Sequence, residues 1–317
     1  MYHRIADPGD TPTLNPRLIN ALPDVFDQQI RYLARHYSVI SLQDVLHAVS
    51  TGVKLPKRAV LLTFDDAYRD FGTIAWPILK HYRLPATLFV PTSYPSQPHS
   101  AFWWDCLYNA MMHTKYGVLS HSPLGDLPLM TTEQRSASLR RLQDYLKSLP
   151  HGAVTAIVDS ISDMLEVPPT EQRSVLNWDE LRQLAREGVT LAAHSQTHAI
   201  LTQLSSEEIL QEIMGSQDDL QREIGHTLPI FCYPSGVHDD RVLALIQRAG
   251  FVMAFATQHG TPSTSLNAQV RLRLGRTNIS RRMSPPIFRL QLTRLGTFLY
   301  RRWRYRKKAG IAPVGQI

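Results

Sequence analysis

Two adjacent carboxylates, Asp65 and Asp66, follow an apolar run at 61–64 that is typical of a buried strand. Neighbouring residues of a strand point to opposite sides, so one acid of such a pair can bind a cation while the other stays free as a base. The structural alternative is an Asp pair that only begins a loop and caps the helix after it. At this point both readings explain the pair.

Two imidazoles lie four residues apart, at His194 and His198, directly after a second apolar run at 191–193. That spacing lets both rings reach one ion. It is weak evidence alone, because thirteen His in 317 residues give roughly half of one such pair by chance. Their position adds to it, since both motifs sit where strands end, and there α/β enzymes gather catalytic groups. One Asp with two His is a ligand set that leaves room for water and substrate.

The two motifs together resemble those of the polysaccharide deacetylases, carbohydrate esterase family 4, also called the NodB homology domain. The first motif reads Thr-Phe-Asp-Asp at 63–66 and the second reads His-Ser-x-x-His at 194–198. The resemblance extends over most of residues 1–280. Its supporting segments are Pro-Ala-Thr-Leu-Phe-Val at 85–90, Trp-Asp-Glu-Leu at 178–181 and Phe-Cys-Tyr-Pro-Ser-Gly at 231–236.

The resemblance implies a role for each motif residue. Asp65 matches the general base, while Asp66, His194 and His198 match the ligands of one divalent metal ion. Zinc is the expected ion, although cobalt, nickel or iron suits the same ligands.

The turn at 233–236 matches the family's third motif. The backbone N–H of Ser235 resembles the family's second oxyanion donor, which turn geometry supplies whatever the side chain. Tyr233 is expected to wall the acetyl pocket, and Pro234 to lie beside it in the substrate site.

The chain also departs from the usual family pattern. Ala67, Cys232 and Ser235 stand where the family commonly has Gly, Arg and an aromatic residue. In typical members that Arg helps to orient the base. A subgroup that includes the biofilm poly-N-acetylglucosamine deacetylases also lacks it, and its barrel is circularly permuted, with a Tyr-His near the amino terminus supplying the acid. Tyr2-His3 fits that subgroup, so the resemblance implies that His3 is the acid.

The same chemistry follows from what amide hydrolysis needs. It requires a nucleophile at neutral pH, a place for the oxyanion and a proton for the leaving amine. A divalent metal meets the first two needs. Asp65 would then take the proton of the attacking water, and His3 as imidazolium would protonate the nitrogen. Because the two groups hold opposite protonation states, a bell-shaped pH profile is expected.

Aromatic residues at 102–104 are further candidates for the cleft. Trp104 is expected to stack on a sugar ring, with Asp105 lining the cleft beside it, although an aromatic run is more often a packing feature. The ten remaining His have no partner at a useful spacing and are interpreted as surface or core residues: His36, His47, His81, His99, His113, His121, His151, His226, His238 and His259.

Alternating strand and helix signals predict a distorted (β/α) barrel with about seven parallel strands. Helices are expected at about 23–36, 42–50, 70–82, 178–187, 205–224 and 239–249. Strands are expected near 38–41, 59–64, 86–90, 190–193, 229–233 and 251–255. Between about 98 and 176 the strand signals stop, which predicts a mostly helical insertion over the cleft. Residues 1–283 would form this catalytic domain.

Composition and cysteine spacing bear on the domain class and on the cellular compartment. The content of 43% hydrophobic and 19% charged residues suits one large α/β domain, and no apolar run is long enough to span a membrane. Cys106 and Cys232 have no disulfide-framework spacing, which favours a reducing compartment. We expect a cytoplasmic enzyme, peripheral at the inner membrane, or an extracytoplasmic one if the natural chain begins upstream.

Charge is distributed unevenly along the chain. From Arg241 onward there is no Asp or Glu, whereas fifteen of the 34 Lys and Arg lie there. In the 284–317 extension, an apolar stripe is expected on one helical face, formed by Phe288, Leu292, Leu295, Leu299 and Trp303. A basic run at 301–308 follows, so an anionic membrane surface is one expected partner. A helix docked on the barrel explains the stripe equally, and nucleic acid is not expected because no binding motif accompanies the charge.

These features predict a metal-dependent enzyme that removes N-acetyl groups from an amino sugar, in a polysaccharide or a lipid-linked glycan precursor. The alternative from another class is a catalytically silent member that binds glycan or membrane within a polysaccharide assembly complex. The departures at Ala67, Cys232 and Ser235 leave room for it, whereas the intact metal motifs argue against it. A nuclease or phosphatase would need a second metal cluster, and the sequence offers none.

Overall fold

The core of the protein is a curled parallel sheet. The computed structural model describes residues 1–97, 101–168, 173–258, 268–293 and 295–300. Five parallel strands are hydrogen-bonded in the order β11-β10-β9-β6-β5. Their bounds are β5 Thr63–Phe64, β6 Thr87–Val90, β9 Thr190–Ala193, β10 Ile230–Cys232 and β11 Met253–Phe255.

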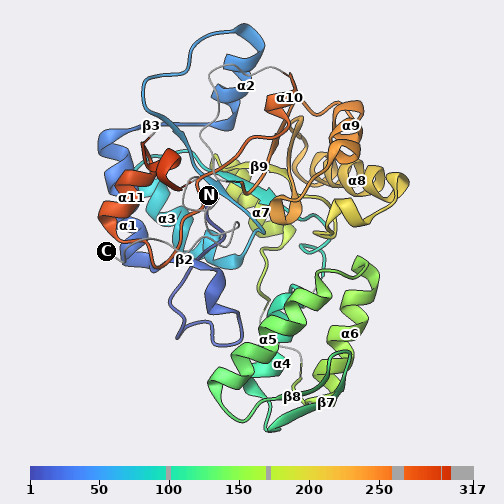
Figure 1. Cartoon of the computed structure of the whole chain (residues 1–317). Coiled ribbons are helices and arrows are strands. Elements are labelled where there is room, and N and C mark those ends of the chain that lie inside the picture. The colour runs from blue at the N-terminus through green and yellow to red at the C-terminus, as the bar shows by residue number, and fades with distance from the viewer. Residues whose placement is uncertain (98–100, 169–172, 259–267, 294, 301–317) are drawn as a thin grey trace.

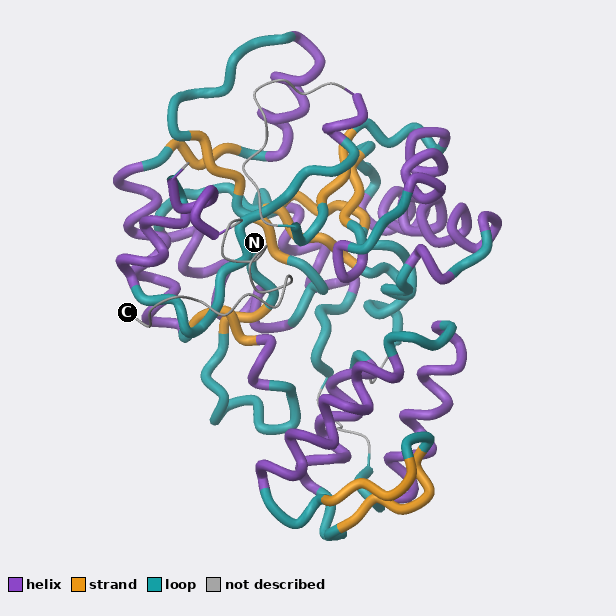
Figure 2. The backbone as a smooth tube through the Cα atoms, in the orientation of Figure 1, coloured by secondary structure: helices purple, strands orange, loops and turns teal. Residues whose placement is uncertain are grey.

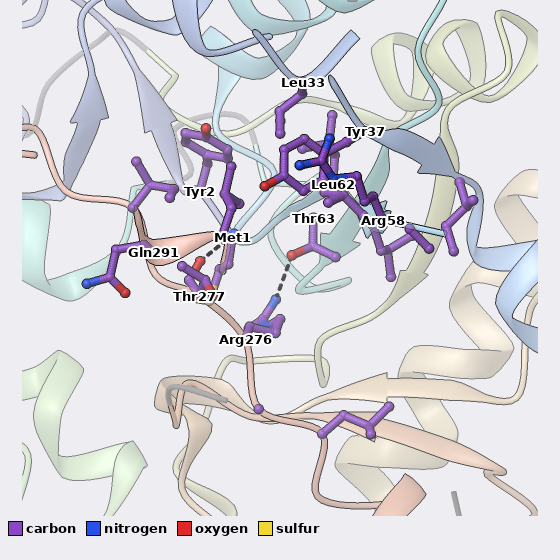
Figure 3. Close-up of a pocket in the computed structure, with 18 of the residues that line it drawn as sticks. Met1, Tyr2, Leu33, Tyr37, Arg58, Leu62, Thr63, Arg276, Thr277 and Gln291 are labelled. Atoms are coloured by element: carbon purple, nitrogen blue, oxygen red, sulfur yellow. Dashed lines mark hydrogen bonds between the residues drawn. The ribbon is translucent and has the colours of Figure 1, made fainter. Parts of the chain in front are cut away.

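The first residues of the chain close this sheet into a barrel. The Tyr2 N–H donates to the Thr63 carbonyl, and the Asp65 N–H donates to the Tyr2 carbonyl. On the other side, the Met1 ammonium donates to the Thr277 carbonyl at 2.8 Å (Figure 3). The segment that holds Thr277 in turn pairs with β11 through Leu274. The predicted distorted barrel is confirmed, and it places Tyr2 beside the strand that ends at Asp65.

Helices surround the barrel within two residues of the predicted bounds (Figures 1 and 2). They are α1 Pro23–His36, α2 Leu42–Thr51, α3 Trp76–His81 after a π-helical turn at Phe71–Ala75, α7 Trp178–Arg186, α8 Ser206–Ile224 and α9 Asp240–Arg248. Reciprocal capping boxes begin α2, α7 and α8. Gly52 and Gly225, both left-handed, end α2 and α8.

The short elements of the barrel wall differ from the prediction in two respects: one expected strand is divided, and two further short strands were not predicted. The run expected as one strand at 59–64 breaks at Leu62 into β4 (Ala59–Leu61) and β5. β4 pairs with β3 (Ser38–Ile40) in a separate two-stranded sheet, and β1 (Arg4–Ile5) pairs with β2 (Ile19–Ala21). Single turns of 3-10 helix lie at Pro16–Leu18, Leu201–Gln203 and Pro234–Gly236.

The insertion forms a lobe beside the barrel, drawn in green in Figure 1. It contains α4 Trp103–His113, β7 Val118–Ser122, β8 Gly125–Pro128, α5 Thr132–Leu146 and α6 His151–Met164. Its three helices pack around a core of their own, separate from the barrel core. The prediction missed the antiparallel β7–β8 hairpin, the orange pair at the far end of the lobe in Figure 2. Its Ser, His, Gly and Pro residues carry little strand propensity.

The C-terminal part packs partly on the barrel. α10 spans Ala268–Arg271 and α11 spans Pro285–Gln291. Phe288 is buried against Tyr32 of α1, whereas Leu295 and Leu299 are exposed. The expected single apolar face is therefore wrong for the described residues, because α11 ends before Leu292. Trp303 lies outside them.

Among the described residues, no helix combines the length and the apolarity needed to cross a lipid bilayer.

A mostly apolar cavity of about 530 Å³ lies behind the barrel closure (Figure 3). Met1, Tyr2, Leu62 and Thr63 line it together with Arg276. Arg276 donates to the Thr63 hydroxyl across its wall. The same guanidinium reaches Asp65, so Arg276 stands between this cavity and the carboxylate pair.

Candidate active site

The carboxylate pair lies at the carboxyl end of β5, where the backbone turns sharply. Asp65 and Asp66 are both buried, and Asp66 adopts a left-handed conformation with φ of 73°. That turn sends the two carboxylates to different partners, as the strand alternation predicted. Asp65 contacts Arg276, and Asp66 contacts the two imidazoles of the second motif.

His194 and His198 lie across from Asp66 at the end of β9. Their Nε2 atoms are 3.4 Å and 3.3 Å from the same Asp66 Oδ1. His194 leaves the strand with its N–H bonded to the Val90 carbonyl. The His198 N–H donates to the Ser195 hydroxyl at 3.0 Å, which holds the loop between the two rings. The three side chains predicted as metal ligands therefore converge on one point.

This cluster fits a divalent cation. Asp66 Oδ1 is buried and has no hydrogen-bond partner in the part of the chain that the structure describes. His194 Nδ1 is 2.8 Å from the Cys232 carbonyl. That carbonyl accepts the Nδ1 proton, so Nε2 is the nitrogen that faces Asp66, and in the neutral ring it carries the lone pair, as in a metal-bound imidazole. A lone pair facing an unpartnered carboxylate oxygen is stable only with a positive charge between them.

Electrostatics point the same way. Burial works against the Asp66 carboxylate, but the His198 and His194 rings outweigh it and hold the pKa of Asp66 well below its usual range. Burial also disfavours a charged His194. Attraction to Cys232 and Asp66 outweighs it and raises the pKa of His194 well above the ordinary value. Both shifts arise because the Asp66 carboxylate favours a positive charge at the imidazole nitrogens that face it, a charge that a proton or the predicted metal ion would supply.

Asp65 is held by a two-pronged ion pair with Arg276. Nη1 donates to Oδ1 at 2.7 Å and Nη2 donates to Oδ2 at 2.6 Å, and both side chains are buried. Burial raises the pKa of Asp65, but the Arg276 charge and hydrogen bonds outweigh it, so the pKa lies below its usual value. Asp65 is therefore ionised and fixed in orientation, as a general base must be.

Arg276 is the functional residue that the sequence reasoning missed. Its Nη2 lies 3.1 Å from the Cys232 sulfur. Cys232 occupies the position at which the family's third motif usually carries Arg. The guanidinium comes instead from the segment that pairs with β11. Leu272 and Leu274 are buried at alternate positions before it. That alternation, continued to residue 276, was the available signal for an Arg facing the barrel interior.

His3 and Ser235 both lie near the cluster. The pairing of Tyr2 with β5 brings His3 close enough for its charge to lower the pKa of both Asp65 and Asp66. The His3 N–H donates to Asn20 Oδ1 at 2.5 Å, which fixes the backbone there. Ser235 lines a small pocket together with His198. The structure thus places both residues beside the metal ligands.

The remaining predicted substrate residues divide into two groups. Trp104 lines the same small pocket and lies edge-on to His198, with ring centroids 5.0 Å apart. Asp105 turns inward and accepts hydrogen bonds from the Tyr68 hydroxyl and the Asn15 N–H. Its expected place in the cleft is therefore wrong, because successive residues at the start of α4 face different sides.

The third-motif residues show the same division. The Tyr233 hydroxyl donates to the Leu272 carbonyl. The Tyr233 side chain is fully buried in the core that the barrel strands share with the surrounding helices. Cys232, the preceding residue, contacts Asp65 on the side of the site, and successive strand residues point to opposite sides. Tyr233 therefore faces away from the site, and the expectation that it walls an acetyl pocket is wrong. Pro234 is buried at the start of the turn that carries Ser235, which makes it a backbone support.

Left-handed backbone is concentrated at this site. Asp66, Ala67, Ser195, His198 and Ser235 all have positive φ without being glycine. Such conformations cost on the order of 1 kcal/mol each and gather where function fixes the backbone. Ala67 has φ of 52°, which explains why glycine is the common family residue at this place.

The insertion reaches over the site. A pocket of about 50 Å³ separates Trp104, His198 and Ser235 from residues of the α5–α6 turn. The Gln203 side chain donates to the Lys147 carbonyl at 2.6 Å and ties the two lobes together at this edge. One predicted metal ligand, His198, thus faces the space between the barrel and the insertion.

Comparison with curated proteins finds relatives that match this chain over a short region only. Poly-beta-1,6-N-acetyl-D-glucosamine N-deacetylase of Staphylococcus aureus (strain MSSA476) is 39% identical over 70 residues, which are 22% of this chain and 24% of that protein. The Escherichia coli (strain K12) protein of the same name is 30% identical over 86 residues, 27% of this chain and 12% of that one. The matched region is thus about a quarter or less of either relative's length.

Solved structures match over most of the chain and establish the fold. The Streptococcus pyogenes deacetylase PplD, in complex with acetate, has a TM-score of 0.61 at 24% identity and covers 92% of this chain and 96% of that chain. The de-N-acetylase from Aggregatibacter actinomycetemcomitans has a TM-score of 0.57 at 18% identity, covering 92% and 97%. IcaB from Ammonifex degensii has a TM-score of 0.54 at 14% identity, covering 93% and 94%.

The family model described as polysaccharide deacetylase matches residues 52–254, which include both metal motifs and the 231–236 turn. The match spans well over half of the chain. This protein belongs to the polysaccharide deacetylase family, carbohydrate esterase family 4.

Proposed function

We propose that the enzyme hydrolyses N-acetyl groups of a β-1,6-linked poly-N-acetylglucosamine or a similar amino-sugar polymer in a metal-dependent reaction. The observation that carries the proposal is the convergence of Asp66, His194 and His198 on one point, with Asp65 beside them. The name of the curated relatives supports the choice of polymer.

In this reaction Asp66, His194 and His198 hold a divalent ion, zinc in the first instance, with cobalt, nickel or iron as other suitable ions. The ion would lower the pKa of its water and polarise the acetyl carbonyl. Asp65 takes the proton of the attacking water, and Arg276 keeps that carboxylate ionised and aimed. The Ser235 N–H donates to the developing oxyanion.

Collapse of the tetrahedral species breaks the carbon–nitrogen bond and releases acetate. His3 donates the proton that the leaving amine needs, so one proton is taken up by Asp65 and one is given by His3 in each turnover. Arg276 argues against the catalytically silent alternative. Cys232 stands where the family usually has Arg, and Arg276 brings a guanidinium to the same place from another part of the chain.

We also propose that the C-terminal segment binds the anionic face of a membrane, from the cytoplasmic side, where a nascent or lipid-linked glycan would be the substrate. Exposed apolar side chains support this: Ile287, Leu290, Leu295, Phe298 and Leu299. The absence of any carboxylate after Asp240 supports it too.

The test of the activity is acetate release from a panel of N-acetylated glycans and lipid-linked amino sugars, with the metal-loaded and the chelator-treated enzyme side by side. Acetate from β-1,6-linked N-acetylglucosamine oligomers, lost with the metal and restored by its return, is the expected result. A loaded enzyme that releases no acetate from any of these substrates contradicts the proposal.

A further inference from the structure

A larger cavity of about 470 Å³ also lies between the barrel and the insertion. On the barrel side it is lined by Ser93, Tyr94 and Thr197, from the loops that follow β6 and β9. Trp103 and His151 line both this cavity and the small pocket at His198, so the two spaces adjoin. Its volume lies in the range of about 300–1,000 Å³ that small-molecule sites occupy.

One face of α6 gives the cavity its polar wall. Thr155, Asp159, Ser162 and Asp163 line it at helical spacing, and both aspartates are exposed to the space. The opposite face of α6 packs into the core of the insertion. The polar face is therefore presented to the cavity by the way in which the helix is buried.

One face of α4 forms the other wall, with Trp103, Cys106 and Asn109. Asp159 lies near this wall, since burial first and then the charges of Asp105 and Asp159 raise the pKa of the Cys106 thiol to about 11. The cavity thus combines an indole, an amide, hydroxyls and two carboxylates, which is a lining suited to a carbohydrate.

The charge of the cavity is opposite to that of the chain. The protein carries a formal net charge of +7, yet no Lys or Arg occurs among the described residues that line this cavity. A uniformly N-acetylated glycan is neutral and would gain nothing from the two carboxylates. The product of de-N-acetylation carries an ammonium group, which pairs with them.

We propose that this cavity is a subsite for amino-sugar units that already carry a free ammonium group, next to the unit being deacetylated. The inference rests on the proposed function and deepens it: the preferred substrate is a partly de-N-acetylated polymer. Trp103 packs on a ring face, and Asp159 and Asp163 pair with the ammonium. Each product unit then helps to hold the chain for the next turnover.

The test compares two β-1,6-linked N-acetylglucosamine oligomers of equal length, one fully acetylated and one partly de-N-acetylated. Acetate release gives kcat/KM on each for the full chain, the Asp159→Asn/Asp163→Asn variant and Asp144→Asn. Asp144 is an exposed control on α5 of the same lobe, outside the cavity. The ratio of kcat/KM for the partly deacetylated over the acetylated oligomer should fall about fivefold in the double variant, the size expected for solvent-exposed ion pairs. It should stay unchanged in Asp144→Asn.

Calorimetry with a fully de-N-acetylated oligomer adds a readout that does not need turnover, and binding should weaken in the double variant. An unchanged ratio and unchanged binding in the double variant overturn the subsite. If the unaltered chain releases no acetate from either oligomer, the proposed function itself fails, which is a different result.

Discussion

The Arg276 guanidinium and the Asp65 carboxylate are joined by two parallel hydrogen bonds of 2.7 Å and 2.6 Å, although 211 residues separate them in the sequence. The pair is buried, and the cation stacks over Phe89 at 5.5 Å. A bidentate pair fixes both the charge and the direction of the carboxylate. Arg276 is thus a positioning residue that acts through Asp65.

Arg276→Met should lower kcat by about a hundredfold and move the acidic limb of the pH–rate profile to higher pH. The reason is that Arg276 lowers the pKa of Asp65, and the base acts only when ionised. The measurement is kcat/KM against pH. Arg273→Met is the control, since Arg273 pairs with the exposed Asp240 and not with the site. A uniform loss of activity with no movement of the acidic limb would mean that Arg276 is only structural.

His3→Ala should lower turnover strongly and remove the high-pH limb of the profile, because the leaving amine then lacks its proton donor. Metal content should stay near that of the unaltered enzyme, since His3 is not among the ligands. Activity is measured as acetate release from pH 5 to 10, and metal by elemental analysis. Normal turnover in His3→Ala would show that another group supplies the proton.

The Asp105→Asn variant should gain stability relative to the unaltered protein as the pH rises from about 4 to 6, and the difference should then level off. Burial raises the pKa of Asp105 to about 6, from an ordinary value of 3.8. A raised pKa means that the folded state favours the protonated acid, so this stabilisation is complete below pH 3.8 and is lost as the pH passes 6. The difference amounts to on the order of 3 kcal/mol at most.

Thermal melts of both proteins across this pH range measure the effect. One hydrogen bond is lost at every pH, so the trend and not the offset is diagnostic. Asp70, whose pKa burial also raises to about 6, is present in both proteins and cancels. A difference in Tm that is flat with pH would show that Asp105 titrates normally.

Replacing Leu295, Phe298 and Leu299 by Ser should remove the salt-resistant part of binding to anionic vesicles, because these exposed side chains are the apolar contribution. Sedimentation with vesicles of varied anionic lipid content measures it. Met130→Ser, at an exposed apolar position of the insertion, is the matched control. Substitution is preferable to truncation before residue 284, since Phe288 packs on the barrel core. Equal sedimentation of both variants and the unaltered chain would contradict the membrane proposal.

Much of the barrel was predictable because its signals are local. The helices begin at capping residues such as Ser41 and Asn177, and the parallel strands are short apolar runs between them. The β7–β8 hairpin was not predictable, because its exposed residues carry no apolar alternation. The predicted apolar stripe that begins at Phe288 was wrong because the helical spacing of apolar residues continues in the sequence, whereas the helix itself ends before Leu292.

The site was predictable where a motif carries its own spacing, as at His194 and His198. Directions of side chains were harder. Tyr233 and Asp105 lie next to functional residues in sequence, yet each faces the core. The role of Arg276 was not predictable from motifs, because Arg276 and its partner Asp65 lie far apart in the sequence. Only the closed barrel brings the two side chains together.

The division of labour between the two carboxylates is the central claim, and one experiment addresses it most directly. Zinc content and acetate release are measured on the same preparations of the unaltered enzyme, Asp65→Asn and Asp66→Asn, with His226→Ala as an exposed His control. Asp65→Asn should keep about one zinc per chain and lose essentially all turnover, whereas Asp66→Asn should lose both. Equal zinc retention in the two Asn variants would contradict the account.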